Sequence, residues 1–176
     1  MKNILAFGAS SSKKSINKAF ASYVAKGITN SEIRILDLND FEMPIYSIDR
    51  ENDDGIPTKA KEFKQHIRWA DGIIVSFAEH NGAYSVAFKN VFDWVSRMDN
   101  EAWEEKPMFL LATSPGARGA QTVLDIAVAK FSRSTNVPAY FSLPSFRENF
   151  DNNKGIINQE LNIEFKEQLS MFIASL

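Results

Sequence analysis

The chain has 176 residues, of which 44% are hydrophobic and 24% charged, and its formal net charge is −2. This length and composition fit a single globular domain, predicted to span residues 1–176, and a charge this close to zero favours neither nucleic acid nor an anionic membrane as a partner. The absence of cysteine excludes disulfides, thiolate metal sites and cysteine nucleophiles, and it is compatible with the cytoplasm, which is the predicted location.

Five short apolar runs along the chain predict β-strands, at residues 3–7, 33–38, 72–77, 107–113 and 139–143. Most are apolar at consecutive positions, which is typical of strands buried on both faces of a parallel sheet. Apolar residues recur at helical spacing between and after these strands, in segments 16–24, 63–70, 86–95, 123–131 and 161–173. The N-terminus leads straight into the first strand and no run reaches the roughly 20 apolar residues of a membrane span, so we expect neither a signal peptide nor a membrane segment.

This repeated alternation of strands and helices predicts a doubly wound, three-layer α/β fold. Three segments do not follow the alternation. Residues 39–58 hold two prolines, a glycine and several acids, and they predict a long loop whose role, as a lid or as a dimer arm, is left open. Residues 144–158 predict a second irregular stretch, and the acidic residues of 101–105 indicate a solvated connection.

For five parallel strands we expect the flavodoxin-like order 2-1-3-4-5, in which ligands bind beyond the carboxyl ends of the strands where the order reverses. The loops near that point should therefore carry the chemistry. They are the loops after the first, third and fourth predicted strands, and they are rich in polar residues, glycine or aromatic residues: 8–17, 78–84 and 114–119. The loop after the second strand carries mostly acids and prolines.

The first of these loops combines hydroxyl groups, an amide and positive charge just before a predicted helix. It contains serines at positions 10, 11, 12 and 15, lysines at 13 and 14, and Asn17. Helix capping explains one serine but not the cluster, whereas a phosphate uses such donors together with the free N–H groups of a helix N-terminus. The loop is neither a Walker A motif nor a G-x-G-x-x-G fingerprint. We therefore predict a phosphate site at Ser10, Ser12, Ser15 and Asn17.

The second and third loops each allow a structural and a functional interpretation. Asn81-Gly82 is a common turn dipeptide, and Tyr84 could be a core aromatic. The functional alternative is that Gly82 lets the backbone approach a flat ring, with Tyr84 or His80 packing at its edge. Residues 114–116 are either a tight turn or a contact for the polar edge of that ring. The position of both loops at the predicted switch point favours a binding role.

Together, these three loops resemble those of the NADPH-dependent FMN reductase family, which includes flavodoxin-like quinone and azo-dye reductases. The resemblance covers most of the chain and rests on residues 8–17, on 79–84 with the helix residues 88–90, Asp93 and Trp94, and on 113–119. Ser12 stands where the family usually has an arginine, with Lys13 and Lys14 beside it. The proline and tyrosine usual in the second loop are Ala78 and His80 here.

The resemblance implies bound FMN, reduced by NADPH or NADH, and transfer of electrons to a small-molecule acceptor such as a quinone, an azo compound or free flavin. It implies a homodimer or homotetramer, no metal and no catalytic side chain. The cofactor-binding residues that it implies are Ser10, Ser12, Ser15, Ile16, Asn17, Glu79, His80, Asn81, Gly82, Tyr84, Ser114, Pro115, Gly116, Arg118 and Gly119. The alternatives are a non-enzymatic electron carrier of the flavodoxin type and a flavin-sensing interaction module.

Overall fold

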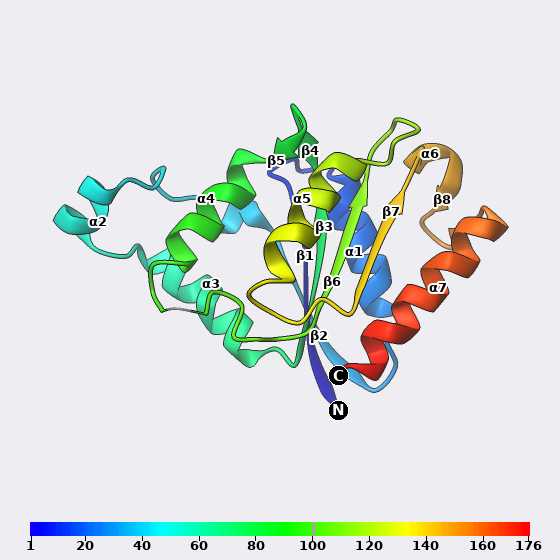
Figure 1. Cartoon of the computed structure of the whole chain (residues 1–176), viewed down its shortest axis with the longest axis horizontal. Helices are drawn as coiled ribbons and strands as arrows, with labels where there is room; N and C mark the ends of the chain where they lie inside the picture. The colour runs from blue at the N-terminus through cyan, green and yellow to red at the C-terminus, as the bar shows by residue number, and fades with distance from the viewer. Residues whose placement is uncertain (100) are drawn as a thin grey trace.

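The computed structural model of the protein describes residues 1–99 and 101–176. Five parallel strands form the central sheet, in the order β2-β1-β3-β6-β7 (Figure 1), with bounds β1 (Lys2–Ala9), β2 (Ser31–Leu36), β3 (Gly72–Phe77), β6 (Met108–Thr113) and β7 (Ala139–Leu143). Every residue of β3 and β6 is buried, as their mostly apolar sequences predicted. The flavodoxin-like α/β fold and its strand order are thereby confirmed.

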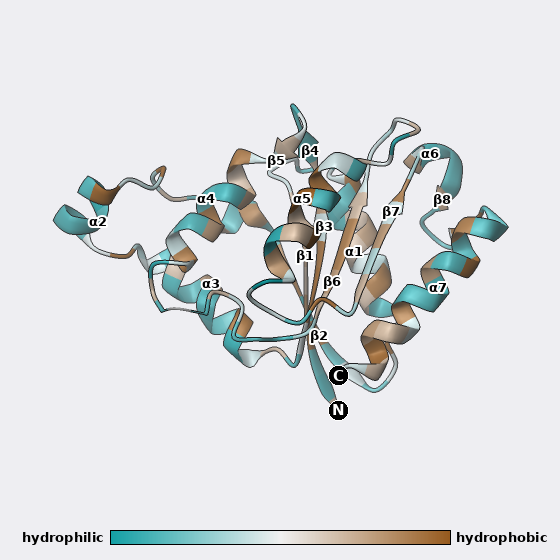
Figure 2. Cartoon of the chain, in the orientation of Figure 1, coloured by the Kyte–Doolittle hydropathy of each residue, from teal (hydrophilic) through white to brown (hydrophobic). Residues whose placement is uncertain are grey.

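Helices cover both faces of the sheet and complete the three layers (Figure 1). Helices α1 (Ile16–Lys26) and α7 (Gln159–Ala174) bury one apolar cluster against it. On the opposite face, α3 (Thr58–Trp69), α4 (Val86–Val95) and α5 (Gln121–Phe131) bury the other. Figure 2 shows the hydrophobic strands enclosed between helices whose outer surfaces are mostly hydrophilic. None of the helices described combines the length and the hydropathy needed to cross a membrane.

The segment 39–58 is not the long loop that the sequence predicted. It contains a 3-10 helix, η1 (Leu38–Phe41), and a short helix, α2 (Ile48–Asp54), which lies apart from the rest of the protein in Figure 1 and has no buried residue. The chain between them is fixed to α4, because the Trp94 indole N–H donates to the Pro44 carbonyl at 2.7 Å. The prolines and the glycine lie outside α2, whose N-cap Ser47 accepts from the Arg50 N–H.

The stretch 144–158 also has regular structure, namely α6 (Phe146–Asn149) and a small hairpin of β8 (Phe150–Asp151) and β9 (Gly155–Ile156). Three members of the predicted apolar helix stripes are exposed rather than in the core: Val86 at 68%, Ile126 at 39% and Ile173 at 44%. Val86 is the first residue of α4. It lies close to the exposed Ile45 on the wall of one surface hollow.

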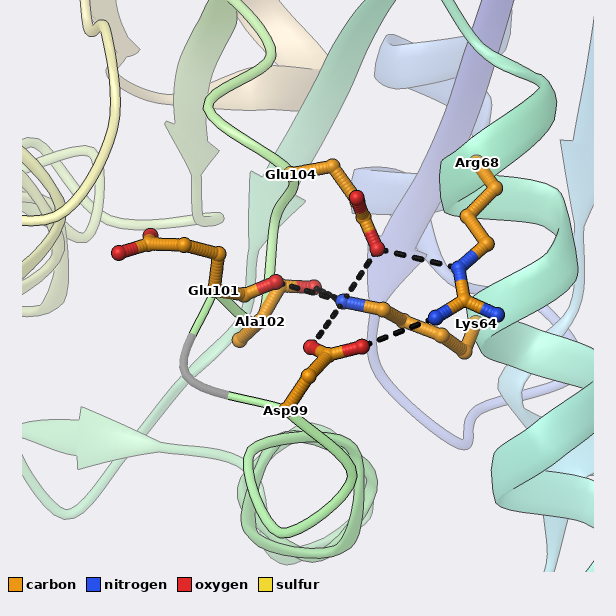
Figure 3. A network of polar contacts seen from close by, with 6 residues as sticks. All are labelled: Lys64, Arg68, Asp99, Glu101, Ala102 and Glu104. Atoms are coloured by element: carbon orange, nitrogen blue, oxygen red, sulfur yellow. Dashed lines mark hydrogen bonds and ion pairs between the residues drawn. The ribbon is translucent and has the colours of Figure 1, made fainter.

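A buried lysine on α3 holds the connection between α4 and β6 (Figure 3). The Lys64 side chain is fully buried, and its amine donates to Asp99 at 2.8 Å and pairs with Glu104 at 2.9 Å. It also donates to the carbonyls of Glu101 and Ala102, at 2.6 and 3.1 Å. Hydrogen bonds from this amine lower the pKa of both carboxyl groups. The interpretation of residues 101–105 as a solvated connection is therefore wrong for Glu104, whereas Glu101 and Glu105 are exposed as predicted.

Candidate functional site

The loops after β1, β3 and β6 meet around a hollow of about 270 Å³ at the carboxyl edge of the sheet. It unites the three loops that the sequence singled out. Its lining residues are Ser10, Ser12, Lys14, Ser15, Ile16, Asn17, Ala78, Glu79, His80, Thr113, Ser114 and Pro115. Nine of these are predicted site residues. Lys14, Ala78 and Thr113 were outside the predicted set, although each lies within or directly beside one of the three loops.

The first loop brings the start of α1 against the end of β1. Gly8 makes this possible, because a Cβ there would lie 2.4 Å from the Lys18 backbone nitrogen. Ser15 is the N-cap of α1, its hydroxyl accepting from the Lys18 N–H at 3.1 Å, so the capping interpretation holds for this serine. The Ser10 hydroxyl accepts from the Ser12 N–H at 3.2 Å. The first N–H groups of α1 thus lie at the hollow, where the helix dipole favours an anion.

Asn17 has a different role from the one predicted for its side chain. It is 3% exposed, and its amide oxygen accepts from the Ser76 hydroxyl at 2.7 Å and from the Thr113 N–H at 3.1 Å. Its amide nitrogen donates to the Thr113 carbonyl at 3.1 Å. The side chain therefore ties α1 to β3 and β6 beneath the hollow. A contact between Asn17 and a phosphate would come through its backbone N–H.

The second loop is a tight hairpin of β4 (Glu79–His80) and β5 (Ala83–Tyr84). Asn81 and Gly82 turn it with φ values of 53° and 73°, the positive pair that a two-residue hairpin requires. A Cβ at Gly82 would meet nothing within 4 Å, so the glycine serves the turn rather than a close approach within the protein. The exposed His80 lies at the rim of the hollow, whereas Asn81 and Gly82 do not line it.

Glu79 and Tyr84 both have partners inside the protein. A Glu79 carboxylate oxygen accepts from the Val123 N–H at 3.1 Å and so satisfies the start of α5, whose N-cap is an alanine. The Tyr84 ring packs against Phe88 and Phe77, with centroids 5.1 and 5.5 Å apart. Burial raises the pKa of its hydroxyl to about 12. The structure thus supports the core-aromatic interpretation of Tyr84.

The third loop separates this hollow from a neighbour. Ser114 and Pro115 line the first hollow, whereas Ala117 and Arg118 line a second one of about 410 Å³ between α5, β7 and α7. Gly116 and Gly119 line neither. Gly119 has φ of 60°, and a Cβ there would lie 2.3 Å from the Ser142 hydroxyl, so both its conformation and its contact require glycine.

Positive charge at the first hollow comes from Lys14, because Lys13 does not line this hollow and Lys18 is paired. Lys18 binds the Asp37 carboxylate at 2.5 Å, and this hydrogen bond lowers the pKa of Asp37. The acid at the end of β2 is thus part of an ion pair that joins α1 to the following segment. In residues 1–99 and 101–176, no cluster of three histidine, aspartate or glutamate side chains could hold a metal.

Comparison with known proteins relates most of the chain to flavin-dependent reductases. Residues 2–148 match the model of a family described as NADPH-dependent FMN reductase. "Probable NADPH:quinone oxidoreductase 2" of Oryza sativa subsp. japonica is 27% identical over 132 residues, which are 73% of this chain and 64% of that protein. "Quinone reductase" of Escherichia coli (strain K12) is 30% identical over 78 residues, 44% of this chain and 42% of that protein. The chain thus spans less than two thirds of each of these relatives.

Solved structures share the fold over nearly the whole chain. The flavoenzyme NAD(P)H:(acceptor) oxidoreductase FerB of Paracoccus denitrificans superposes with a TM-score of 0.75, covering 99% of this chain and 97% of FerB, at 22% identity. An azoreductase from Bacillus anthracis superposes with a TM-score of 0.63, covering 98% of this chain and 99% of that one, at 13% identity. At such identities the superpositions establish the architecture and not the activity.

Proposed function

The chain belongs to the NADPH-dependent FMN reductase family, and from that premise we propose that it is an FMN-dependent oxidoreductase. It takes hydride from NADPH or NADH and delivers electrons to a quinone, an azo compound or free flavin. One observation carries the proposal: the loops after three strands and the N-terminus of α1 converge on a single hollow. This is the switch-point position at which sheets of this order bind ligands.

An FMN phosphate suits the donors at the first loop. The N–H groups that open α1, the hydroxyls of Ser10 and Ser12, and the Lys14 amine all lie at this hollow. Backbone donors and a lysine together bind phosphate without arginine, although lysine acts as a point charge rather than as a fork. The flavin ring would then lie beside residues 78–80 and 114–115, on the other walls of the same hollow.

FMN, when bound, supplies the redox chemistry, while the chain binds, orients and shields it. His80 and Pro115 are exposed at the rim of the hollow and leave an approach from solvent. NAD(P)H and the electron acceptor can use this approach in turn, which predicts ping-pong kinetics. We assign no side chain as an obligatory acid or base. Tyr84, the one tyrosine in the three loops, has its hydroxyl buried among aromatic rings.

A comparison of FMN with riboflavin tests the phosphate assignment. Purified protein should bind FMN at least about 100-fold more tightly than riboflavin, because only FMN has the phosphate that makes charge-assisted hydrogen bonds. Quenching of flavin fluorescence measures both affinities. Equal affinities would overturn the assignment of the first loop.

Turnover separates a reductase from its alternatives. FMN-loaded protein mixed with NADPH and a benzoquinone should consume NADPH absorbance, with parallel lines in double-reciprocal plots. A yellow protein that leaves NADPH unconsumed would instead be an electron carrier or a flavin sensor, and the reductase proposal would fail.

We propose that the protein acts as a homodimer or homotetramer, in the cytoplasm. Support for assembly comes from three exposed apolar side chains: Ile45 before α2 at 66%, Ile48 at the start of α2 at 57%, and Val86 at the start of α4 at 68%. Ile45 and Val86 border a partly apolar hollow of about 290 Å³. Exposed apolar groups at the border of a concavity, as Ile45 and Val86 are here, are typical of protein interfaces. Sedimentation at micromolar concentration tests this proposal, and a monomer there would overturn it.

A further inference from the structure

The second hollow has no role in flavin binding as proposed above, yet it is the larger of the two, at about 410 Å³ against about 270 Å³. It lies at the edge of the sheet, where β7 runs beside α7 (Figure 1). Five of its polar or aromatic residues come from four elements: Arg118, Gln121, Tyr140, Glu164 and Gln168. None of them lines the first hollow.

Arg118 stands between the two hollows. Its guanidinium is 3.9 Å from the Glu79 carboxylate, which lines the first hollow, while Arg118 itself lines the second. The Arg118 side chain is 84% exposed, so one distant carboxylate leaves most of its donors available. An arginine of this kind binds phosphate with two parallel hydrogen bonds. A ligand that occupies both hollows can therefore contact this side chain between them.

The remaining groups suit a nucleoside. Tyr140 is 50% exposed on edge strand β7 and offers a ring on which a base can stack. The Gln168 amide oxygen accepts from the Tyr140 N–H at 3.1 Å, which leaves the Gln168 amide NH₂ group as a donor for the edge of a base. The exposed Glu164 carboxylate can accept from ribose hydroxyls, as acids do in dinucleotide sites.

We propose that the second hollow binds the adenosine half of NAD(P)H and that Arg118 binds its pyrophosphate. The inference rests on the proposed function, in which the nicotinamide half enters the first hollow. A dinucleotide consists of two nucleosides joined by a pyrophosphate. Each nucleoside would occupy one hollow, and the pyrophosphate would lie at Arg118 between them. Because the pyrophosphate is common to NADH and NADPH, binding of both should depend on Arg118 equally.

Binding of ADP-ribose, which is the dinucleotide without its nicotinamide, tests the subsite directly. In FMN-loaded protein, Arg118→Ala and Tyr140→Ala should each weaken ADP-ribose binding about tenfold, the size expected from losing a charge-assisted pair or a stacked base. Isothermal calorimetry measures this affinity, and circular dichroism confirms folding. The matched control is Arg133→Ala, because Arg133 is also exposed but follows the far end of α5. Unchanged ADP-ribose affinity in both variants would overturn the subsite.

Kinetics with a truncated donor separate this inference from the proposed function. In Tyr140→Ala, kcat/KM for NADH should fall about tenfold relative to kcat/KM for reduced nicotinamide mononucleotide, which lacks the adenosine that Tyr140 would stack on. Equal loss with both donors in this variant would contradict the adenosine subsite while leaving the reductase intact. In Arg118→Ala, a larger loss with NADPH than with NADH would place Arg118 at the 2′-phosphate and overturn the pyrophosphate assignment. If wild-type protein oxidises none of these donors, the proposed function itself has failed.

Discussion

Two buried polar clusters join distant parts of this chain, and they differ in chemistry and in place. Asn17, Ser76 and Thr113 form a neutral cluster beneath the first hollow, at the carboxyl ends of the strands. Lys64, with Asp99 and Glu104, forms a charged cluster on α3, where the chain enters β6 (Figure 3). The neutral cluster lies directly under the proposed phosphate site. No residue of the charged cluster lines the first hollow.

The two clusters differ in what they stabilise. The charged cluster holds a connection that brings Trp103 into the aromatic core, so its loss should affect stability alone. The neutral cluster fixes where α1 begins relative to β3 and β6, so its loss should affect stability and ligand binding together. The following variants test this difference.

Lys64→Met should have the largest effect. It leaves the Glu101 and Ala102 carbonyls without their donor, at a cost of about 1–3 kcal/mol for each in the free energy of unfolding. Asp99 and Glu104 are about one third exposed and keep Arg68 as a partner. Urea denaturation measures this loss. The control is Lys61→Met, because Lys61 is exposed on the same helix. FMN affinity should stay within about twofold of wild type, which is well below 1 kcal/mol, and a tenfold loss would break the comparison.

Asn17→Ala should lower stability less and binding more. It leaves the Ser76 hydroxyl and the Thr113 backbone groups without their partner, which costs about 1–3 kcal/mol. FMN affinity should also fall about tenfold, because the first N–H groups of α1 lose their fixed position. Ser76→Ala removes one of these hydrogen bonds and should show a smaller change of both kinds. An Asn17→Ala protein of full FMN affinity would show that this cluster is structural only.

Ser15→Ala and Ser47→Ala compare two serine N-caps, one at the first hollow and one on α2. Loss of the cap of α1 should lower the free energy of unfolding by about 1 kcal/mol. Loss of the cap of α2 should change it by less than about 0.5 kcal/mol, because α2 has no buried residue to couple it to global unfolding. FMN affinity should fall only in Ser15→Ala, as flavin fluorescence titration would report.

The charged cluster should also change how the free energy of unfolding depends on pH, and this is the smallest of the expected effects. Asp99 and Glu104 have lowered pKa values in the folded protein, chiefly through hydrogen bonds from Lys64. Such groups stabilise the fold fully when the pH is above their pKa values in the unfolded protein, about 4. They lose that contribution as the pH falls through their lower pKa values in the folded protein. Urea midpoints should therefore decline less steeply below about pH 4 in the Asp99→Asn/Glu104→Gln variant than in wild type. Equal slopes would contradict this assignment.

Where sequence-based prediction failed, the partners of a residue lay far along the chain. Residues 39–58 looked irregular because prolines and a glycine stand out locally, yet the segment is fixed by Trp94 from a helix that follows it. Glu104 looked like a solvated acid because nothing near it in the sequence indicates that Lys64, on another helix, would be buried against it. The pattern of neighbouring residues in the sequence does not indicate contacts between residues that are far apart along the chain.

The sequence by itself determined the sheet, its strand order and the three loops that meet at its edge. Strands buried on both faces must be apolar at consecutive positions, and loops that follow parallel strands must gather at one edge. Only the tertiary structure decided which polar side chains in those loops remain free for a ligand. The polar groups of Asn17 and Glu79 are hydrogen-bonded within the protein, the Tyr84 ring is packed against other aromatic rings, and Arg118 is largely exposed. The physical reason is that a hydrogen bond or an aromatic contact forms wherever folding places its partner, and the partners of Asn17 and Glu79 are 96 and 44 residues away.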